Sequence, residues 1–430
     1  MKSGKNKLLP ILLALAVMLS MLVLTACSGV GGSIAGNTAL SQTSQLVSPV
    51  DTASAVSLAA SSDTGAIADD AFSNRDLSGE YDADEATAID LNSYNGSDVI
   101  ISEAGTFVLT GTLENGSVVI DASSEDKIQL VLNGACISSD SYAAIYVKQA
   151  DKVFITLAEG TENTLSNGGS FVQKDDNTVD GVIFSKDDLT INGTGTLTIV
   201  SPAGHGVVCK DELVITGGTI KITAGSHAIQ AKDSIAVAGG NITLRAGKDG
   251  LHAENDEDDT LGTIYVTGGS FSINVGDDGI HAESLLRIDG GAFDITAAEG
   301  LEATYVQIND GDITISASDD GINAARKSTA YTHAVEINGG SLDISMGQGD
   351  TDGIDANGNL IITGGTIAVT GNSAFDYDGS VTWTGGTVTV NGQQQTEITN
   401  QMMGGPGGMG GMGGQPGSGG MGGFGGGRRR

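Results

Sequence analysis

Asp-Gly-Leu-His-Ala at residues 249–253 is one of five copies of a short phrase in the second half of the chain. The others are Asp-Gly-Ile-His-Ala at 278–282, Glu-Gly-Leu-Glu-Ala at 299–303, Asp-Gly-Ile-Asn-Ala at 320–324 and Asp-Gly-Ile-Asp-Ala at 352–356. Where no insertion intervenes, the phrase recurs every 21 or 22 residues. Self-similarity at a fixed period predicts a repeat architecture, in which each unit buries its apolar face against its neighbours.

Short alternating segments lie between the copies. Apolar residues take every second position in 219–223 (Thr-Ile-Lys-Ile-Thr), 270–273 (Ser-Phe-Ser-Ile) and 292–295 (Ala-Phe-Asp-Ile). This alternation, with glycine turns between segments, predicts half-buried strands. About 22 residues per turn then predict an all-β chain, a single parallel β-helix whose coils stack about 4.8 Å apart. The predicted inward residues include Ile220, Ile222, Phe271, Ile273, Phe293 and Ile295.

The first 27 residues have the order of an export signal. Three lysines precede an apolar run from Leu8 to Leu24, and Cys27 follows small residues. This order predicts a lipoprotein signal peptide at 1–27, with Cys27 as the lipidated first residue of the mature protein. The alternative is a retained membrane helix, although a run of 17 residues barely spans a bilayer. We expect an extracytoplasmic lipoprotein, held on the bacterial cell surface through its lipid alone.

Composition divides the rest of the chain into three parts. Residues 28–75 are rich in Ser, Ala, Thr and Gly, which predicts a flexible linker. The repeats define a β-helix domain at 76–397, and residues 398–430 form a Gly/Met-rich tail that cannot bury enough surface to fold. Cys136 and Cys209 align with inward positions of different columns, so we expect two buried thiols too far apart for a disulfide.

The charge balance narrows the class of partner. The chain has 20 Lys and Arg against 53 Asp and Glu, a formal net charge of −33. This charge argues against nucleic acid and anionic lipid and favours cations. Aromatic residues make up only 4% of the chain, and the single Trp383 falls in the last coil. We expect Trp383 in the core or cap, no flat aromatic strip for crystalline polysaccharide, and a monomer.

Alignment of the copies places acidic residues in two columns. The turn column, which begins each phrase, contains His205, His227, Asp249, Asp278, Glu299, Asp320 and Asp352. The strand column, three residues later, contains Val208, Gln230, His252, His281, Glu302, Asn323 and Asp355. Turn chemistry explains aspartate before glycine. It does not explain acids at strand positions, which therefore suggest function.

Stacked carboxylates need compensation. Two of them about 5 Å apart repel by about 0.8 kcal/mol in water and about 3 kcal/mol at an effective dielectric of 20, so protons or cations must bind. Ca²⁺ accepts six to eight oxygen ligands in loose geometry. The expected metal ligands are Asp249, Asp277, Asp278, Glu299, Glu302, Asp319, Asp320, Asn323, Asp352 and Asp355. His252 and His281 would admit a transition metal, but they stand among acids without a cysteine, so we favour calcium over zinc. We expect each histidine to form hydrogen bonds rather than to bind a metal.

Two insertions leave the coil just after the phrase. One contains the acidic run 254–259, and the other is 326–333. We expect them to wall the two ends of a trough over the coils of Asp278 and Glu299, since long loops on rigid scaffolds often carry function. Solenoids also tolerate such loops without purpose. The predicted ligand-binding residues are Lys248, His252, His281, Arg326 and Lys327.

Several separated blocks resemble one known family. They are Glu-Ala-Gly-Thr-Phe-Val-Leu-Thr-Gly-Thr-Leu at 103–113, Lys-Ile-Gln-Leu-Val-Leu-Asn at 127–133, Ala-Ile-Tyr-Val-Lys at 144–148, Leu-Ala-Glu-Gly-Thr-Glu-Asn at 157–163 and Ser-Asp-Asp-Gly-Ile-Asn-Ala-Ala at 318–325. Over roughly residues 80 to 395 the chain resembles a family of secreted bacterial carbohydrate-binding proteins. The resemblance implies a right-handed, pectate-lyase-like parallel β-helix, bound calcium, and cellulose or acid sugars as ligands. The family's acidic phrase falls on Asp277, Asp278, Glu299, Glu302, Asp319, Asp320 and Asn323.

Three functions remain open. The first is noncatalytic binding of extracellular, acidic polysaccharide, with calcium bridging protein and sugar carboxylates. The second is a structural envelope protein that calcium stiffens. The third is a calcium-dependent polysaccharide lyase with Lys248 as the base, although an ion pair with the adjacent Asp249 would hold Lys248 protonated. We rank them in this order and assign no catalytic residue.

Overall fold

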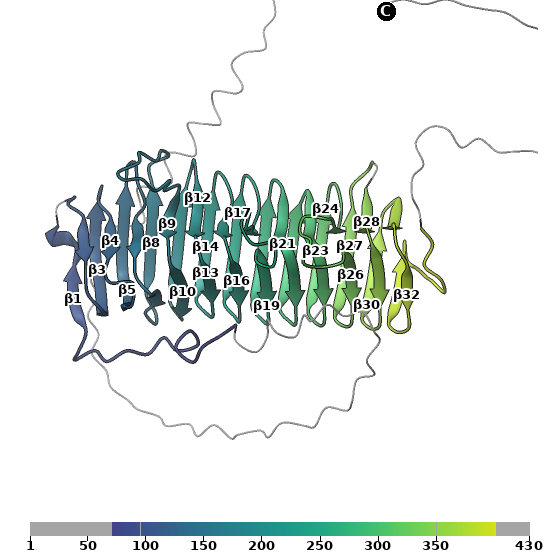
Figure 1. The fold of residues 1–430 in the computed structure, drawn as a ribbon, viewed down its shortest axis with the longest axis horizontal. Coiled ribbons are helices and arrows are strands. Elements are labelled where there is room, and N and C mark those ends of the chain that lie inside the picture. Colours follow the sequence, from purple (N-terminus) through teal and green to yellow (C-terminus); the bar gives the residue numbers. More distant parts are fainter. Residues whose placement is uncertain (1–70, 95, 350, 401–430) are drawn as a thin grey trace, which may run out of the picture.

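The computed structural model describes residues 71–94, 96–349 and 351–400. They form a parallel β-solenoid of about 13 turns, drawn in Figure 1 as one elongated stack, which confirms the predicted fold class. Within these ranges there is no α-helix, and no helix long and apolar enough to cross a membrane. The predicted signal peptide with Cys27, most of the predicted linker and nearly all of the predicted tail lie outside the described residues.

Each coil contributes up to three short strands, which pair in parallel with the coils before and after and so build three faces. Face I contains β2 (Val99–Ile101), β4 (Val118–Asp121), β6 (Ile145–Gln149), β9 (Gly181–Ser185), β12 (His205–Cys209), β15 (Ile229–Ala231), β18 (Leu251–Ala253), the first parts of β21 (Asp278–Ile288) and β23 (Glu299–Ile308), β25 (Ile322–Ala324), β28 (Asp352–Ala356) and β31 (Ser373–Tyr377).

Face II contains β1 (Thr87–Asp90), the first parts of β3 (Gly105–Glu114) and β5 (Lys127–Ser139), β7 (Lys152–Leu157), β10 (Asp188–Gly193), β13 (Glu212–Ile215), β16 (Ser234–Val237), β19 (Thr263–Val266), the last parts of β21 and β23, β26 (Ala334–Ile337), β29 (Asn359–Ile362) and β32 (Val381–Trp383). Face III contains the last parts of β3 and β5, β8 (Glu162–Asn167), β11 (Thr196–Ser201), β14 (Thr219–Ala224), β17 (Asn241–Ala246), β20 (Ser270–Val275), β22 (Ala292–Ala297), β24 (Asp312–Ala317), β27 (Ser341–Met346), β30 (Thr366–Thr370) and β33 (Thr387–Val390). A 3₁₀ turn, η1 (Leu91–Ser93), follows β1, and β34 (Gln393–Gln394) pairs antiparallel with β33.

The core is a continuous column of inward side chains. Ile242, Phe271 and Phe293 occupy one register position of Face III, and the two phenyl rings stack 4.6 Å apart. The inward apolar residues predicted in the alternating segments are all buried, which confirms that pattern: Ile220, Ile222, Phe271, Ile273, Phe293 and Ile295. Trp383 packs against the core from the last coil, as expected. Alternation between core and solvent fixes the register, because a shift by one residue would expose every core side chain of a strand.

The two cysteines do not share one environment. Cys209 is fully buried, as predicted. Cys136 lies between Thr112 and Thr164 on the outward row of Face III and is only half-buried, so its predicted inward position is wrong. The error arises because Gly134 shifts the register of β5 where the strand passes from Face II to Face III.

The phrase glycine is required by close packing. A Cβ on Gly279 would lie 2.5 Å from the carbonyl oxygen of Gly300 and 2.5 Å from Cγ2 of Ile295. The phrase glycines do not have positive φ, whereas the second glycine of each Gly-Gly pair between Faces II and III does, as at Gly269 (φ 109°) and Gly291 (φ 111°). The chain therefore uses glycine for close approach at one corner and for left-handed backbone at another.

An arm of chain before β1 packs on Face II. Asp76 is 2% exposed, and its Oδ1 lies 3.0 Å from Nζ of Lys152 and accepts a hydrogen bond from Thr190. Asn192 donates to the backbone oxygen of Asp76. Figure 1 shows this arm running beneath the coils.

Candidate functional site

The strand column is real and lies on the outside of Face I. Its members are register partners from coil to coil, in the order Gln230, His252, His281, Glu302, Asn323, Asp355 and Asp376. The column therefore continues to Asp376, which follows Ala374 in the degenerate last copy of the phrase and was not predicted. Parallel pairing holds these side chains close together along the solenoid axis.

The turn column connects successive coils. The backbone N–H of Asp278 donates to Oδ1 of Asp249 at 3.0 Å, and the backbone N–H of Asp352 donates to Oδ1 of Asp320 at 2.9 Å. One oxygen of each aspartate thus satisfies the turn of the next coil, as turn chemistry predicts. The other oxygen of each aspartate takes no part in this contact between coils.

The two columns meet in an open pocket of about 640 Å³ on Face I. Nine predicted site residues line it: Lys248, Asp249, His252, Asp277, Asp278, His281, Glu299, Glu302 and Lys327. The other predicted residues lie outside it: Asp319, Asp320, Asn323, Arg326, Asp352 and Asp355. The lining also contains Asp180, His205, Lys210, His227, Gln230 and Glu254, which the site prediction missed. Asp180-Gly181 begins a degenerate phrase, and His205, His227 and Gln230 stand in the aligned columns, so these four were detectable.

Four histidines from successive coils form a stack along the pocket. The ring centroids of His205, His227, His252 and His281 are separated in turn by 5.1, 4.3 and 4.7 Å. Burial, together with the neighbouring His227, lowers the pKa of His205 to about 3, so this ring is neutral at physiological pH.

One aspartate serves two of these rings. Oδ2 of Asp249 lies 3.0 Å from Nδ1 of His227 and 2.6 Å from Nδ1 of His252. Burial opposes ionisation of Asp249, but these two hydrogen bonds outweigh it and hold the pKa of Asp249 well below its usual range. The carboxylate is therefore ionised, and it faces imidazole nitrogens.

His281 and Lys327 place positive charge beside the carboxylates of the next coils. Nδ1 of His281 lies 2.8 Å from Asp278 and 2.9 Å from Glu302, and Nζ of Lys327 lies 2.8 Å from the other oxygen of Glu302. Burial opposes the charge on His281, but these two carboxylates raise its pKa to about 10. Burial likewise opposes ionisation of Glu302, but His281 and Lys327 lower its pKa to about 2. An imidazolium and an ammonium thus compensate Glu302.

Two other carboxyl groups of the pocket, Glu299 and Asp278, keep their protons to a higher pH than usual. Burial, and then the charge of Glu302, raises the pKa of Glu299 to about 8, although Asn323 donates a hydrogen bond of 3.0 Å to it. Burial and the charges of Asp249 and Glu302 raise the pKa of Asp278 to about 6. Of the two remedies expected for stacked acids, protonation therefore serves Glu299 near neutral pH, and it serves Asp278 only below about pH 6.

A second acid group, the distal acid cluster, consists of Asp320, Asp352, Asp355 and Asp376. Burial and mutual repulsion raise the pKa of Asp320 to about 6 and that of Asp355 to about 7. Within the described ranges, Asp320, Asp355 and Asp376 form no ion pair with a basic side chain. This cluster therefore retains unmet demand for positive charge.

The two insertions meet each other, which differs from the expected walls at two ends of a trough. The hydroxyl of Ser328 donates to the backbone oxygen of Asp259, and the backbone N–H of Thr329 donates to its carboxylate at 3.3 Å. Each insertion also gives one residue to the pocket, Glu254 and Lys327 respectively. The insertions therefore bridge the coils between them along one edge of the pocket.

The predicted basic residues have different fates. Lys327 binds Glu302, while Arg326 is exposed outside the pocket. Lys248 lines the pocket and is exposed, but the expected ion pair with Asp249 is absent from the described part of the chain. The reason is that Asp249 points to His227 and His252 instead.

Among the described residues, three overlapping sets of side chains bring their ligand atoms within 4.8 Å of one another. They are the His–Asp cluster (His227, Asp249, His252), an intermediate set (Asp249, Asp278, His281) and the tricarboxylate cluster (Asp278, Glu299, Glu302). Calcium binds oxygens at 2.3–2.6 Å, so oxygens on opposite sides of one ion stand about 4.8 Å apart. The all-oxygen tricarboxylate cluster therefore fits calcium by donor type and separation.

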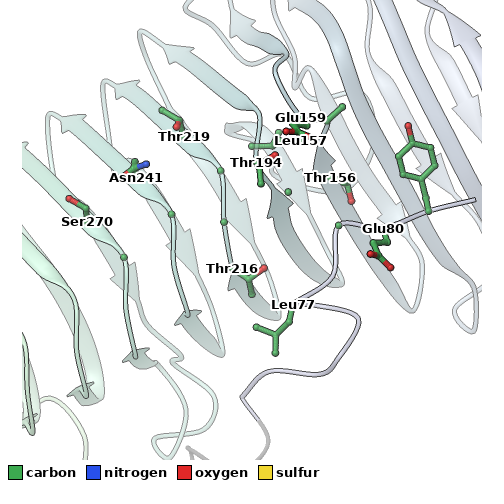
Figure 2. A pocket seen from close by; sticks show the side chains of 18 residues that line it. Leu77, Glu80, Thr156, Leu157, Glu159, Thr194, Thr216, Thr219, Asn241 and Ser270 are labelled. Carbon is green, nitrogen blue, oxygen red and sulfur yellow. The ribbon is translucent and has the colours of Figure 1, made fainter. Parts of the chain in front are cut away.

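A second hollow, of about 920 Å³, lies between the arm and the corner of Faces II and III. Figure 2 shows Thr219, Asn241 and Ser270 on neighbouring strands along one side and Leu77 and Glu80 of the arm along the other. Glycine turns form much of the remaining wall. This groove lacks the titratable cluster that marks the pocket on Face I.

A rigid solenoid that repeats polar side chains along one face defines a class of scaffold for extended ligands. A family model described as carbohydrate-binding domain-containing protein matches residues 95–351 and 299–403, and the chain belongs to this family. A carbohydrate-binding domain-containing protein of Acetivibrio thermocellus is 34% identical over 166 residues, which are 37% of this chain and 58% of that relative. The chain thus spans less than two thirds of that relative's length. A solved structure of a polysaccharide lyase-like protein from C. thermocellum, a gadolinium derivative, matches 62% of this chain and 98% of its own, with 26% identity and a TM-score of 0.46.

Proposed function

We propose that the protein is a noncatalytic, calcium-dependent binder of acidic polysaccharide, anchored to the outer surface of a bacterial cell through lipid on Cys27. Membership of a carbohydrate-binding family supports the ligand class. The observation that carries the proposal is the tricarboxylate cluster in the pocket on Face I, where raised carboxyl pKa values mark a demand for positive charge.

Calcium is proposed to bind among Asp278, Glu299 and Glu302. All the donors are oxygens, as calcium requires. The ammonium of Lys327 already holds one oxygen of Glu302, so calcium competes with it there. The distal acid cluster, with Asp319 beside it, is the second proposed position. Asp249 is left out of this set because two imidazoles face its free oxygen.

Pocket charge explains why an ion is needed for an acidic ligand. Seven carboxylates and three lysines line the pocket. A uronate polymer would be repelled by this surface unless divalent ions bridged the sugar and protein carboxylates. Because the strand column places one polar or charged side chain on each coil from Gln230 to Asp376, a polymer lying along Face I would meet such a group at every coil.

A lyase mechanism has weaker support. Lys327 carries an ion pair with Glu302 that raises its pKa above the usual value, despite the opposing effect of burial, so it is a poor base. Lys248 is exposed, and among the described residues no contact is seen that would make it a base. Binding without catalysis is therefore proposed ahead of the lyase.

Retention on immobilised polygalacturonate, with insoluble cellulose as a second matrix, tests the function. We expect retention on polygalacturonate in calcium, loss in chelator, and loss for Asp278→Asn. The matched control is Asp343→Asn, which removes an exposed carboxylate from Face III.

The other outcomes contradict parts of the proposal. A rise in ultraviolet absorbance from unsaturated uronate products would establish a lyase. Calcium stabilisation without retention on either matrix would favour the structural role. Retention on cellulose alone would refute the acidic ligand, and retention that ignores chelator would refute calcium bridging.

A further inference from the structure

The histidine end of the pocket offers different ligand atoms from the acidic end. His227, Asp249 and His252 come from two successive coils, and their side chains are only 3% to 9% exposed. Two imidazoles and a carboxylate are a poor donor set for calcium, which selects oxygen. They are a common set for zinc and other divalent transition metals.

The distances in the His–Asp cluster suit one small ion. Both Nδ1 atoms point at the same oxygen of Asp249, at 3.0 Å for His227 and 2.6 Å for His252. Ligand atoms about 2.1 Å from a tetrahedral zinc ion stand about 3.4 Å apart. The distances from Oδ2 of Asp249 to the two Nδ1 atoms would therefore each increase by less than about 1 Å, which small rotations of the side chains allow. Three protein ligands leave a fourth position open toward the pocket.

Outer contacts orient two of the three ligands. Nε2 of His252 lies 3.1 Å from Glu254, so an Nε2–H donated to that carboxylate leaves Nδ1 to face the ion. The backbone N–H of Asp278 holds Oδ1 of Asp249, which leaves Oδ2 for the ion. Carboxylate–histidine–metal arrangements of this kind are typical of zinc sites. The backbone N–H of Asp249 makes a long contact of 3.3 Å with Nδ1 of His227, which an ion would replace.

Unmet hydrogen-bonding capacity lies beside this cluster. Nδ1 of His205 and Oδ1 of Asp180 are buried without a hydrogen-bond partner in the described part of the chain. Both side chains line the same pocket. Buried polar atoms are normally satisfied, so these two mark the histidine end as a place that binds a solute or ordered water.

We propose that His227, Asp249 and His252 form a site for one divalent transition metal ion of the zinc class, separate from the calcium site at the tricarboxylate cluster. His281 stays on the calcium side, because its Nδ1 lies between Asp278 and Glu302. The inference does not depend on the proposed function, since it concerns metal alone.

Calorimetric titration of Zn²⁺ into the full-length chain without a polyhistidine tag, with and without calcium, tests the site. We expect one Zn²⁺ per chain, and at least tenfold weaker binding for His227→Gln and His252→Gln. His333→Gln is the matched control, because it removes an imidazole that lies outside this pocket and outside the histidine stack. Co²⁺ in place of Zn²⁺ should give visible d–d bands that His252→Gln abolishes.

Equal zinc affinity in the wild type and His252→Gln would overturn the proposal. So would loss of zinc binding in Glu299→Gln, which would place zinc at the oxygen ligands. Melting in calcium checks each variant for folding. If His227→Gln or His252→Gln unfolds, Glu254→Gln replaces it: this change keeps all three ligands and should weaken zinc by about tenfold through lost orientation. An unchanged affinity in that variant would also count against the site.

Discussion

Glu299→Gln should make the metal-free protein more stable, and calcium should cancel or reverse that gain. Ligand atoms of Glu299, Asp278 and Glu302 lie within 4.8 Å of one another. Two full charges at that distance repel by about 0.9 kcal/mol in water and about 3.5 kcal/mol at an effective dielectric of 20. Glu299 is partly exposed, and Lys327 and His281 already compensate Glu302, so the lower part of this interval applies. We expect the metal-free variant to be about 1–2 kcal/mol more stable than the wild type at pH 8.

Calcium should cancel or reverse this order. Glutamine keeps the acceptor for Asn323 but supplies a neutral ligand, so we expect about tenfold to hundredfold weaker calcium binding, worth about 1.4–2.7 kcal/mol at saturation. The assay is denaturant unfolding at pH 8 in chelator and in excess calcium, compared by midpoints because a solenoid need not unfold in two states. Glu162→Gln, an exposed change on Face III, is the matched control and should move neither midpoint. A variant that is less stable than the wild type in both conditions would refute the electrostatic reasoning.

Three further predictions concern competition, packing and pH. Lys327→Gln removes the ammonium that competes with calcium for Glu302, so calcium should bind about threefold to tenfold more tightly in a calorimetric titration. Weaker calcium binding would show instead that Lys327 supports the site. Gly300→Ala would place a Cβ 2.4 Å from the carbonyl oxygen of Gly321 and should lower the free energy of unfolding by about 3 kcal/mol. The control Gly347→Ala, whose Cβ would meet nothing closer than 3.4 Å, should lower it much less. Equal losses would refute the close-packing account. Burial and like charge raise several carboxyl pKa values to between about 6 and 8, so the folded chain holds more protons than the unfolded chain between about pH 4.5 and 8. The stability of the metal-free protein should therefore fall as pH rises through this window, and calcium should stabilise the protein more at pH 8 than at pH 5. A calcium effect independent of pH would contradict this linkage.

The fold was predictable because its determinants are local and repeated. A core position such as Ile295 can be assigned from the alternation of its own strand, and every copy of the repeat confirms the assignment. The strand column followed from the same alignment, since stacking in register converts sequence period into spatial proximity. The sequence therefore predicts well those features that depend only on the register between coils, such as core positions and the members of each column.

Side-chain partners were less predictable because they depend on directions that a period does not contain. Asp249 was aligned with the acids, yet its free oxygen faces the rings of His227 and His252. Lys327 could be placed on an insertion but not paired with Glu302, because the path of that insertion depends on its contact with the other one. Cys136 was misplaced by one position because a glycine corner interrupts the alternation of β5.

The most direct measurement is a crystal structure of the chain with calcium and an oligogalacturonate. We expect calcium bounded by Asp278, Glu299 and Glu302, with a uronate carboxylate on the same ion and the sugar chain along Face I. Calcium bound elsewhere with this cluster unchanged, or sugar in the groove of Figure 2, would contradict the account.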